Sequence, residues 1–350
     1  MHGQKRIRGS KLEIERIKNA EKIKKYRALS EALAKARKEQ DFSENGLKTS
    51  SHLLNINADY YTAWSFRRQI LEDIYEKEKD DDNHEHSLKL VQGELGFLED
   101  LLLRHPKSYW LWLHRCWVLQ RLDRVYHQSS QWKRELSLCS RFLNADKRNF
   151  HCWNYRRWVA NQSPDQSLQA EIDFTTEKIE QDFSNYSAWQ HRSLLFQRIV
   201  EENNDTTSSS SSTSSTSSSS SSSSLTKNEK FQKLLSNEFE YVQQAFYTEP
   251  EDQSAWFYYR WLLKVCQSEA LLKRELVVIE ELLEEEPRSK WVLLTTVHIM
   301  FELDRVANTS QYQGLIEKRI ELLKKVDVDR QHFYQDQAQT MLSTFYSKLN

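Results

Sequence analysis

The chain has 350 residues, of which only 6 are Gly and 4 are Pro, whereas 11 are Trp, 15 are Tyr and 15 are Phe. Tight turns in sheet-rich folds depend on Gly and Pro, so this scarcity argues against sandwiches, barrels and propellers. No GxGxxG or GxxxxGK[ST] string for a phosphate loop is present. The formal charge of −1, from 50 basic and 51 acidic residues, gives no indication of nucleic-acid binding. These features favour long helices joined by short turns.

The sequence predicts a cytoplasmic protein without a membrane span. No apolar run reaches the roughly 18 residues needed to cross a bilayer, and no apolar signal segment follows the basic start MHGQKRIRGS. The four cysteines, Cys116, Cys139, Cys152 and Cys266, do not form CxxC pairs. Neither a disulfide framework nor a cysteine-based zinc site is therefore indicated.

Residues 1–40 are expected to form a basic N-terminal arm and helix, because they contain 13 Lys or Arg and only 5 Asp or Glu. An internal repeat then marks residues 41–202. Its four copies are the strings ADYYTAWSFRR (58–68), KSYWLWLHRCW (107–117), RNFHCWNYRRW (148–158) and SNYSAWQHRS (184–193). We interpret this region as four copies of one structural unit.

A Ser/Thr-rich insertion interrupts the repeats at residues 203–228. Its centre, residues 206–224, consists only of Ser and Thr. Such a tract can bury no apolar surface, so we predict that it is disordered. Residues 229–350 contain a fifth copy, a degenerate sixth copy and a final helical pair. Their strings are EDQSAWFYYRW (251–261) and PRSKWVLL (287–294).

Each repeated Trp is predicted to lie near the start of a helix, because the residues four and seven places later share its helical face. An amphipathic segment, such as ELGFLEDLLLR (94–104), precedes each such helix. The unit is therefore a hairpin of two antiparallel helices, and hairpins must stack to bury their apolar stripes. The expected fold is all-α: a crescent-shaped α-α superhelix, or solenoid, of stacked helical hairpins.

The repeated side chains have structural interpretations. We expect the tryptophans to form the packed core of the array. The arginines that follow them could tie one hairpin to carboxylates or carbonyls of the next, or some could meet an anionic partner on an open surface. The positions chosen for the repeat are Trp64, Trp112, Trp153, Trp189, Trp256, Arg68, Arg115, Arg157, Arg192 and Arg260.

No self-sufficient active site is visible in the sequence. It has no HExxH string, no His/Cys ligand spacing and no convincing Ser-His-Asp order. The cluster NHEH (83–86) is expected to be a solvated loop, and the acidic run at 280–286 a solvated helix face. The residues alone therefore predict a helical solenoid that binds another protein.

The repeated Trp-Arg strings resemble those of the α subunits of protein prenyltransferases, over roughly residues 40–300. Three strings are most similar to the branch that acts on Rab GTPases: MHGxxR (1–6), NFHCWNYRR (149–157) and EDQSAWFYYRWLL (251–263). The resemblance implies a heterodimer in which a β subunit holds the catalytic Zn²⁺ and the lipid pocket. That enzyme would transfer geranylgeranyl from geranylgeranyl diphosphate to C-terminal cysteines of Rab GTPases presented by an escort protein.

The resemblance also implies roles for four residues. Family members place a Lys near the lipid diphosphate, five residues before a repeat Trp, and Lys107 has that spacing, with Tyr109 two places later. Arg148 has the equivalent place one repeat later and could contact the substrate. His2 could ligate the zinc of the β subunit in a resting state. No metal or cofactor is expected on this chain alone.

Two alternatives remain at this point. The chain could be the α subunit shared by farnesyltransferase and geranylgeranyltransferase type I, which modify CaaX proteins without an escort protein. It could also be a tetratricopeptide-like scaffold with no part in catalysis. Those repeats have a 34-residue period with Gly and Ala at fixed contact points, whereas Trp and Arg mark the repeats here.

Overall fold

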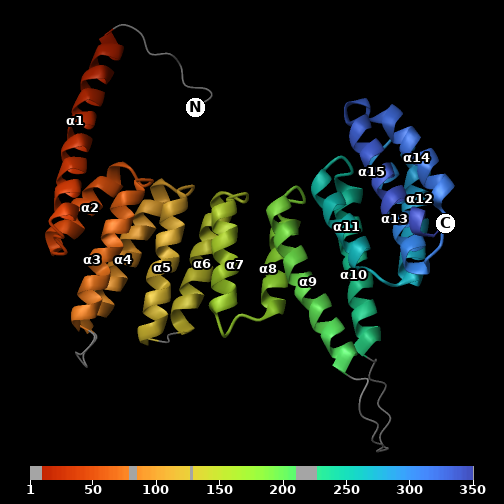
Figure 1. Cartoon of the computed structure of the whole chain (residues 1–350), viewed down its shortest axis with the longest axis horizontal. Coiled ribbons are helices and arrows are strands. Elements are labelled where there is room, and N and C mark those ends of the chain that lie inside the picture. The colour runs from red at the N-terminus through yellow and green to blue at the C-terminus, as the bar shows by residue number, and fades with distance from the viewer. Residues whose placement is uncertain (1–9, 79–84, 127–128, 210–226, 350) are drawn as a thin grey trace, which may run out of the picture. The chain divides into compact units, whose positions relative to one another are not determined.

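The computed structural model describes residues 10–78, 85–126, 129–209 and 227–349, so His2 lies outside it. These residues form α-helices and two short 3₁₀ turns, and consecutive helices pack as antiparallel hairpins (Figure 1). The predicted all-α fold of helical hairpins is confirmed. The chain divides into two compact units, residues 1–165 and 166–350.

The first unit contains a leading helix and three hairpins. Its helices are α1 (Ser10–Lys38), α2 (Glu44–Ile56), α3 (Tyr61–Glu78), α4 (Glu85–Arg104), α5 (Tyr109–Tyr126), α6 (Ser129–Ala145) and α7 (Phe150–Gln162). The second unit contains α8 (Leu168–Glu180), α9 (Tyr186–Ser209), α10 (Lys227–Thr248), α11 (Gln253–Val265), α12 (Glu269–Glu285), α13 (Lys290–Ala307), α14 (Gln313–Val326) and α15 (Gln331–Thr344). Its two 3₁₀ turns are η1 (Val328–Arg330) and η2 (Tyr346–Lys348).

The basic helix α1 is attached to the first unit by its C-terminal part. Leu33 and Ala36 are buried against the following hairpin, whereas Ile14, Ile17 and Ile23 are each more than half exposed. Figure 1 shows the N-terminal part of α1 extending beyond α2. The helix therefore presents both apolar and basic side chains to solvent.

Helices α9 and α10 extend into the two ends of the range predicted for the Ser/Thr-rich insertion, 203–228. Helix α9 continues through Ser209 and α10 already begins at Lys227. Once a helix is nucleated, each further residue adds one backbone hydrogen bond, so a strong amphipathic helix can extend into a polar tract. Residues 210–226 lie outside the described part of the chain.

The repeated Trp side chains join each second helix to the turn before it. All five are at most 4% exposed. Each indole Nε1–H donates to the carbonyl oxygen six residues earlier, at 2.8–2.9 Å; the pairs are Trp64–Ala58, Trp112–Pro106, Trp153–Lys147, Trp189–Phe183 and Trp256–Pro250. In the degenerate copy, the Trp291 indole N–H instead donates to the backbone carbonyl of Glu251 at 3.3 Å. Glu251 lies in the turn of the previous hairpin, between α10 and α11.

Adjacent turns within a unit are also hydrogen-bonded to one another. Ser108 Oγ donates to Asp59 Oδ1 at 2.5 Å, and Asn149 Nδ2 donates to the Pro106 carbonyl at 3.0 Å. Asn149 also caps α7, because its Oδ1 accepts the N–H of Cys152. These bonds satisfy polar groups at the helix N-termini and hold consecutive turns side by side.

A ladder of buried ion pairs connects consecutive hairpins. The arginine three residues after a repeat Trp reaches a glutamate on the first helix of the next hairpin. The nitrogen–oxygen distances are 2.6–2.7 Å for Arg67 with Glu94, 2.7 Å for Arg115 with Glu135 and 2.5–2.8 Å for Arg192 with Glu238. All six side chains are buried, and each guanidinium binds its carboxylate with two nitrogens, which is the strongest geometry for such a pair.

The same glutamates accept a second donor from their own hairpin. This donor stands two residues after the Trp: His114 contacts Glu94 at 2.9 Å, Tyr155 donates to Glu135 at 2.7 Å and Tyr258 donates to Glu238 at 2.6 Å. One carboxylate therefore joins two hairpins. We define these arginines, glutamates and second donors as the buried ladder.

Burial distinguishes the two neighbouring arginines of the first and third copies. Arg68 and Arg157 are only partly buried, whereas Arg67 and Arg156, one residue earlier, are buried. Arg156 Nη1 donates to the Leu136 carbonyl at 3.3 Å. The arginine three places after the Trp donates to a backbone carbonyl on the first helix of its own hairpin in each of the first four copies.

The fifth copy departs from this pattern. Tyr259 takes the position of the buried arginine and donates to Glu275 at 2.7 Å. Arg260, which the sequence placed in the repeat, instead lies over the rings of Phe257 and Trp291, 4.9 and 5.8 Å from their centroids. Burial lowers its pKa to about 10.

Candidate functional site

The three candidate residues of the described chain lie at the N-terminal ends of neighbouring second helices. Lys107 is in the turn before α5, Tyr109 is the first residue of α5, and Arg148 is in the turn before α7. All three are exposed, with Lys107 at 73% and Tyr109 at 54%. The structure therefore brings together two turns that are separated by about 40 residues in sequence.

A contact that the sequence analysis did not foresee joins these turns. Lys107 Nζ lies 3.2 Å from Asp146 Oδ2. The other carboxylate oxygen, Oδ1, accepts the backbone N–H of Arg148 at 3.2 Å. The candidate cation is therefore balanced by a carboxylate that the turn itself holds in place.

Exposed aromatic side chains surround this pair of turns. Tyr61, Tyr109 and Phe150 are each at least half exposed and stand three residues before the repeat Trp. Trp110 and His151 lie between them, with ring centroids at 4.5 Å for Tyr61–Trp110, 5.2 Å for Tyr109–Trp110, 6.2 Å for Tyr109–His151 and 4.0 Å for Phe150–His151. We call these five residues the aromatic strip.

Sequence reasoning identified only Tyr109 from the aromatic strip. A usable signal was present, because an aromatic residue precedes the Trp by three places in four copies, including Tyr186 in the second unit. Tyr186 is 52% exposed. Contiguous exposed apolar side chains mark interaction surfaces, and the aromatic position three places before the Trp provides such side chains in neighbouring copies.

Two opposing effects act on the pKa of His151 in the aromatic strip. Partial burial lowers its pKa, and the nearby Asp59 carboxylate opposes this effect. The lowered pKa favours the neutral imidazole, which can donate or accept a hydrogen bond.

The described residues contain no group of three or more His, Cys, Asp or Glu side chains able to hold a metal ion. Half of the predicted solvated loop NHEH (83–86) lies outside them. Within the same described ranges, no helix is both long and apolar enough to cross a bilayer.

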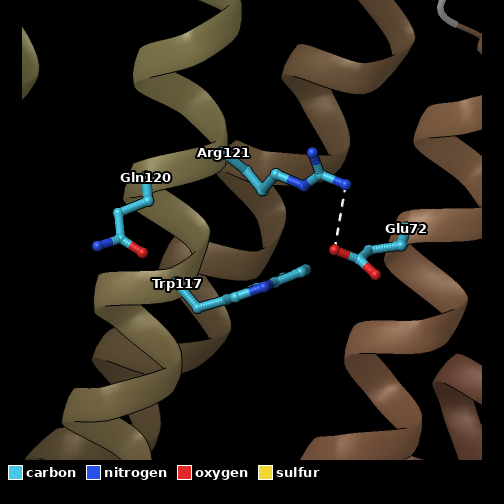
Figure 2. A pocket seen from close by; sticks show the side chains of 4 residues that line it. All are labelled: Glu72, Trp117, Gln120 and Arg121. Carbon is cyan, nitrogen blue, oxygen red and sulfur yellow. Dashed lines mark hydrogen bonds and ion pairs between the residues drawn. The ribbon is translucent and has the colours of Figure 1, made fainter.

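A separate pocket of about 320 Å³ opens between α3 and α5 of the first unit. It is lined by Glu72, Trp117, Gln120 and Arg121. Figure 2 shows Arg121 extending toward Glu72, with the Trp117 ring beside the pair, and an Arg121 nitrogen lies 3.1 Å from Glu72 Oε1. None of the predicted site residues lines this pocket, so we place the candidate site at the turns and not here.

Comparison with known proteins gives the family. A model described as "Protein prenyltransferase alpha subunit repeat" matches residues 43–74, 91–122, 132–163, 168–199 and 235–266, and each segment covers most of one hairpin of the structure. The geranylgeranyl transferase type-2 subunit alpha of Dictyostelium discoideum is 34% identical, over 95% of this chain and 98% of that protein. The chain belongs to the protein prenyltransferase α-subunit family. The resemblance inferred from the Trp-Arg strings is confirmed.

Other family members carry the same name. The type-2 α subunit of Candida albicans is 32% identical over 96% of this chain and 97% of that protein. That of Rattus norvegicus is 40% identical, but the match covers 75% of this chain and only 42% of the rat protein. The chain thus spans less than half the length of the mammalian relatives that it matches.

A solved family structure supports the fold. "Candida albicans protein geranylgeranyltransferase-I complexed with GGPP" superimposes with a TM-score of 0.66, covering 91% of each chain at 21% identity. At this identity the likeness bears on the fold alone. It agrees with the α-α superhelix expected from stacked hairpins.

Proposed function

We propose that this chain is the α subunit of a heterodimeric protein geranylgeranyltransferase that acts on Rab GTPases. With a β subunit, it would transfer geranylgeranyl from geranylgeranyl diphosphate to C-terminal cysteines of Rab proteins presented by an escort protein, in the cytoplasm. The names of relatives that match over nearly their whole length support this proposal. The observation that carries it in the structure is the pair of cationic turns beside the aromatic strip.

The chemistry explains why a second chain is needed. Alkylation of a thiol requires a thiolate, and a zinc ion makes one at neutral pH by lowering the thiol pKa. The described residues offer no cluster for that ion. Burial raises the pKa of the Cys116 thiol to about 12 and that of Cys139 well above its usual value, which disfavours the reactive thiolate at these two positions. We assign zinc and thiol activation to the β subunit.

This chain would assist departure of the diphosphate. Negative charge grows on the leaving diphosphate as its bond to the lipid breaks, and a nearby ammonium stabilises that charge. Lys107 is exposed at the end of a flexible side chain, so it can reach an anion held on a partner surface. Tyr109 adds a hydroxyl donor to the same turn, and Arg148 adds a second cation one hairpin later.

The aromatic strip would supply the apolar surface next to these charges. Tyr61, Tyr109 and Phe150 are each at least half exposed in the isolated chain. Burial of such side chains against a partner removes substantial apolar area from water. We propose that the strip packs against the β subunit at the mouth of the lipid pocket, so that the cations and the diphosphate meet at the interface.

Substitution of Lys107 tests this function. In a heterodimer co-expressed with the β subunit, Lys107→Ala is expected to lower kcat about tenfold or more without dissociating the subunits, because a lost electrostatic contact to a leaving group is worth roughly this factor or above. Steady-state kinetics with an escort protein and a Rab substrate would measure kcat, and co-purification of the subunits would check that the heterodimer is intact. A turnover equal to that of the native heterodimer would contradict the assignment.

A matched control is available in the same unit. Lys133 forms a similar exposed pair with Asp165, at 3.1 Å and with the lysine 68% exposed, but it is not in a turn before a second helix. Lys133→Ala is expected to leave turnover unchanged.

Modification of CaaX peptides in the absence of an escort protein would place the chain with the type I enzymes instead.

A further inference from the structure

The carboxylate of Asp146 has two contacts of different kinds. Oδ1 accepts the backbone N–H of Arg148 at 3.2 Å, which closes the turn between α6 and α7. Oδ2 lies 3.2 Å from Lys107 Nζ in the previous turn. The backbone of Asp146 is itself fixed, because its N–H donates to the Phe142 carbonyl at 2.9 Å and its carbonyl accepts the N–H of Asn149 at 3.1 Å. Asp146 is thus anchored, while Lys107 can move.

The turn needs an acceptor at this place but does not need a charge. In the first copy the equivalent residue is Asn57, whose amide oxygen accepts the N–H of Asp59 at 3.1 Å. In the fourth copy Asp182 accepts the N–H of Ser184 at 3.2 Å in the same way. An asparagine therefore closes the turn as well as an aspartate does, so turn closure alone does not require the negative charge at Asp146.

We propose that Asp146 is the internal counter-ion of Lys107: it holds the ammonium when the site is empty and is displaced when a diphosphate binds. This inference rests on the proposed function of Lys107. Asp146 is a positioning residue, because it acts on the substrate through the lysine.

The exposure of the pair makes this exchange feasible. Lys107 is 73% and Asp146 37% exposed, and ion pairs in contact with water are weak. A diphosphate carries several negative charges, so it outcompetes a single carboxylate for the same ammonium. The Lys107–Asp146 pair would also limit the affinity of the site for a diphosphate. The pair must break each time a diphosphate binds, and it can re-form each time the diphosphate leaves.

The test is Asp146→Asn in the heterodimer with the β subunit, because asparagine retains the Oδ1 acceptor for the turn. Isothermal titration with geranylgeranyl diphosphate and with inorganic pyrophosphate would give the Kd values. We expect Asp146→Asn to lower both Kd values by about 3- to 10-fold at low salt. The decrease should be smaller at about 0.5 M salt, because salt screens the interaction. We expect KM for the lipid diphosphate to fall without a rise in kcat. A purely structural defect would weaken binding.

The matched control is Glu249→Gln, which removes the charge at the same place in the turn before α11. There the previous turn has Ser184 at the Lys107 position, and the Ser184 hydroxyl donates to Glu249 Oε2 at 3.1 Å. Glu249→Gln should leave both Kd values within about twofold of the native heterodimer. Unchanged or weakened binding by Asp146→Asn would overturn the proposal, as would an equal decrease in Kd caused by Glu249→Gln.

The double variant with Lys107→Ala separates the counter-ion role from simple repulsion of the ligand. The tightening caused by Asp146→Asn should be at least threefold smaller when Lys107 is absent. Equal tightening in both backgrounds would refute the counter-ion role. If Lys107→Ala alone changes neither affinity nor turnover, the proposed function of Lys107 fails. If Lys107→Ala lowers affinity or turnover but Asp146→Asn leaves both Kd values unchanged, only the counter-ion inference fails.

Discussion

Glu135 is the residue of the buried ladder whose loss should damage the first unit most. It is fully buried and accepts hydrogen bonds from Arg115 Nε and Nη2 at 2.7 Å each, from the Tyr155 hydroxyl at 2.7 Å and from Gln131 at 3.0 Å. Glu135→Ala removes both carboxylate acceptors of the Arg115 guanidinium, which keeps the Leu95 carbonyl at 3.0 Å. Removal of one member of a buried pair destabilises a protein by about 3–5 kcal/mol.

The expected loss is a large part of a domain's total free energy of unfolding, which is about 5–15 kcal/mol. Urea unfolding followed by circular dichroism would measure it. Hydrogen exchange of the α5–α7 amides would locate it, because a helical array need not unfold in one step. Glu99 provides a matched control, because it also pairs with two arginines, Arg134 and Arg141, but at the surface. Glu99→Ala should lose about 1 kcal/mol or less.

Replacement of the whole buried set tests the cause of the damage. Arg115→Met, Glu135→Leu and Tyr155→Phe together remove the charges and the hydroxyl while keeping similar volume. Apolar replacement of buried ion pairs is often neutral or stabilising, so the triple variant should recover most of the stability that Glu135→Ala loses. If Glu135→Ala loses no more than Glu99→Ala, the ladder does not hold these hairpins together and the reasoning is refuted.

Three further predictions concern stability and assembly. Arg67 and His114 outweigh the effect of burial and lower the pKa of Glu94 to about 2 from 4.5. Stability from Glu94 is therefore complete above pH 4.5 and lost as the pH falls toward 2, so the native chain should lose about 2 kcal/mol more than Glu94→Gln between pH 5 and pH 3 in urea titrations. Trp256→Phe removes a buried donor 2.8 Å from the Pro250 carbonyl and should lower the free energy of unfolding by about 2 kcal/mol. The hydrogen bond of Trp291 is longer, at 3.3 Å, so Trp291→Phe should lower the free energy of unfolding by less. Deletion of residues 210–224, which follow the end of α9, should leave the heterodimer yield on co-purification unchanged, because loop closure depends only weakly on length. A collapse in yield would show that the tract supports the fold.

The helical hairpins could be predicted from the sequence because one strong signal repeats. Trp64, Trp112, Trp153, Trp189 and Trp256 each set the helical phase, and their spacing gives the unit. The partner of each buried arginine could not be read in the same way. Arg67 and Arg68 are neighbours of identical type, so only the packed structure decides which one faces Glu94, 27 residues away.

The residues proposed for the candidate site came from the family resemblance, which implies a Lys five residues before a repeat Trp, and Lys107 has that place. The contacts of these residues could not be read from the sequence. The pairing of Lys107 with Asp146 depends on two turns that become neighbours only when α4–α5 packs on α6–α7. The aromatic strip could not be predicted for a related reason. The sequence does not distinguish an exposed aromatic residue from a buried one until the buried face of the helix is known.

The buried ladder also bears on how such a chain could lengthen during evolution. The hairpin α4–α5 carries an acceptor, Glu94, on its first helix and a donor, Arg115, on its second, so it accepts from one neighbour and donates to the other. Tandem duplication of a whole hairpin would leave every buried charge matched. Insertion of a single helix would leave one buried charged side chain without its partner. The number of helices could therefore change only in steps of two.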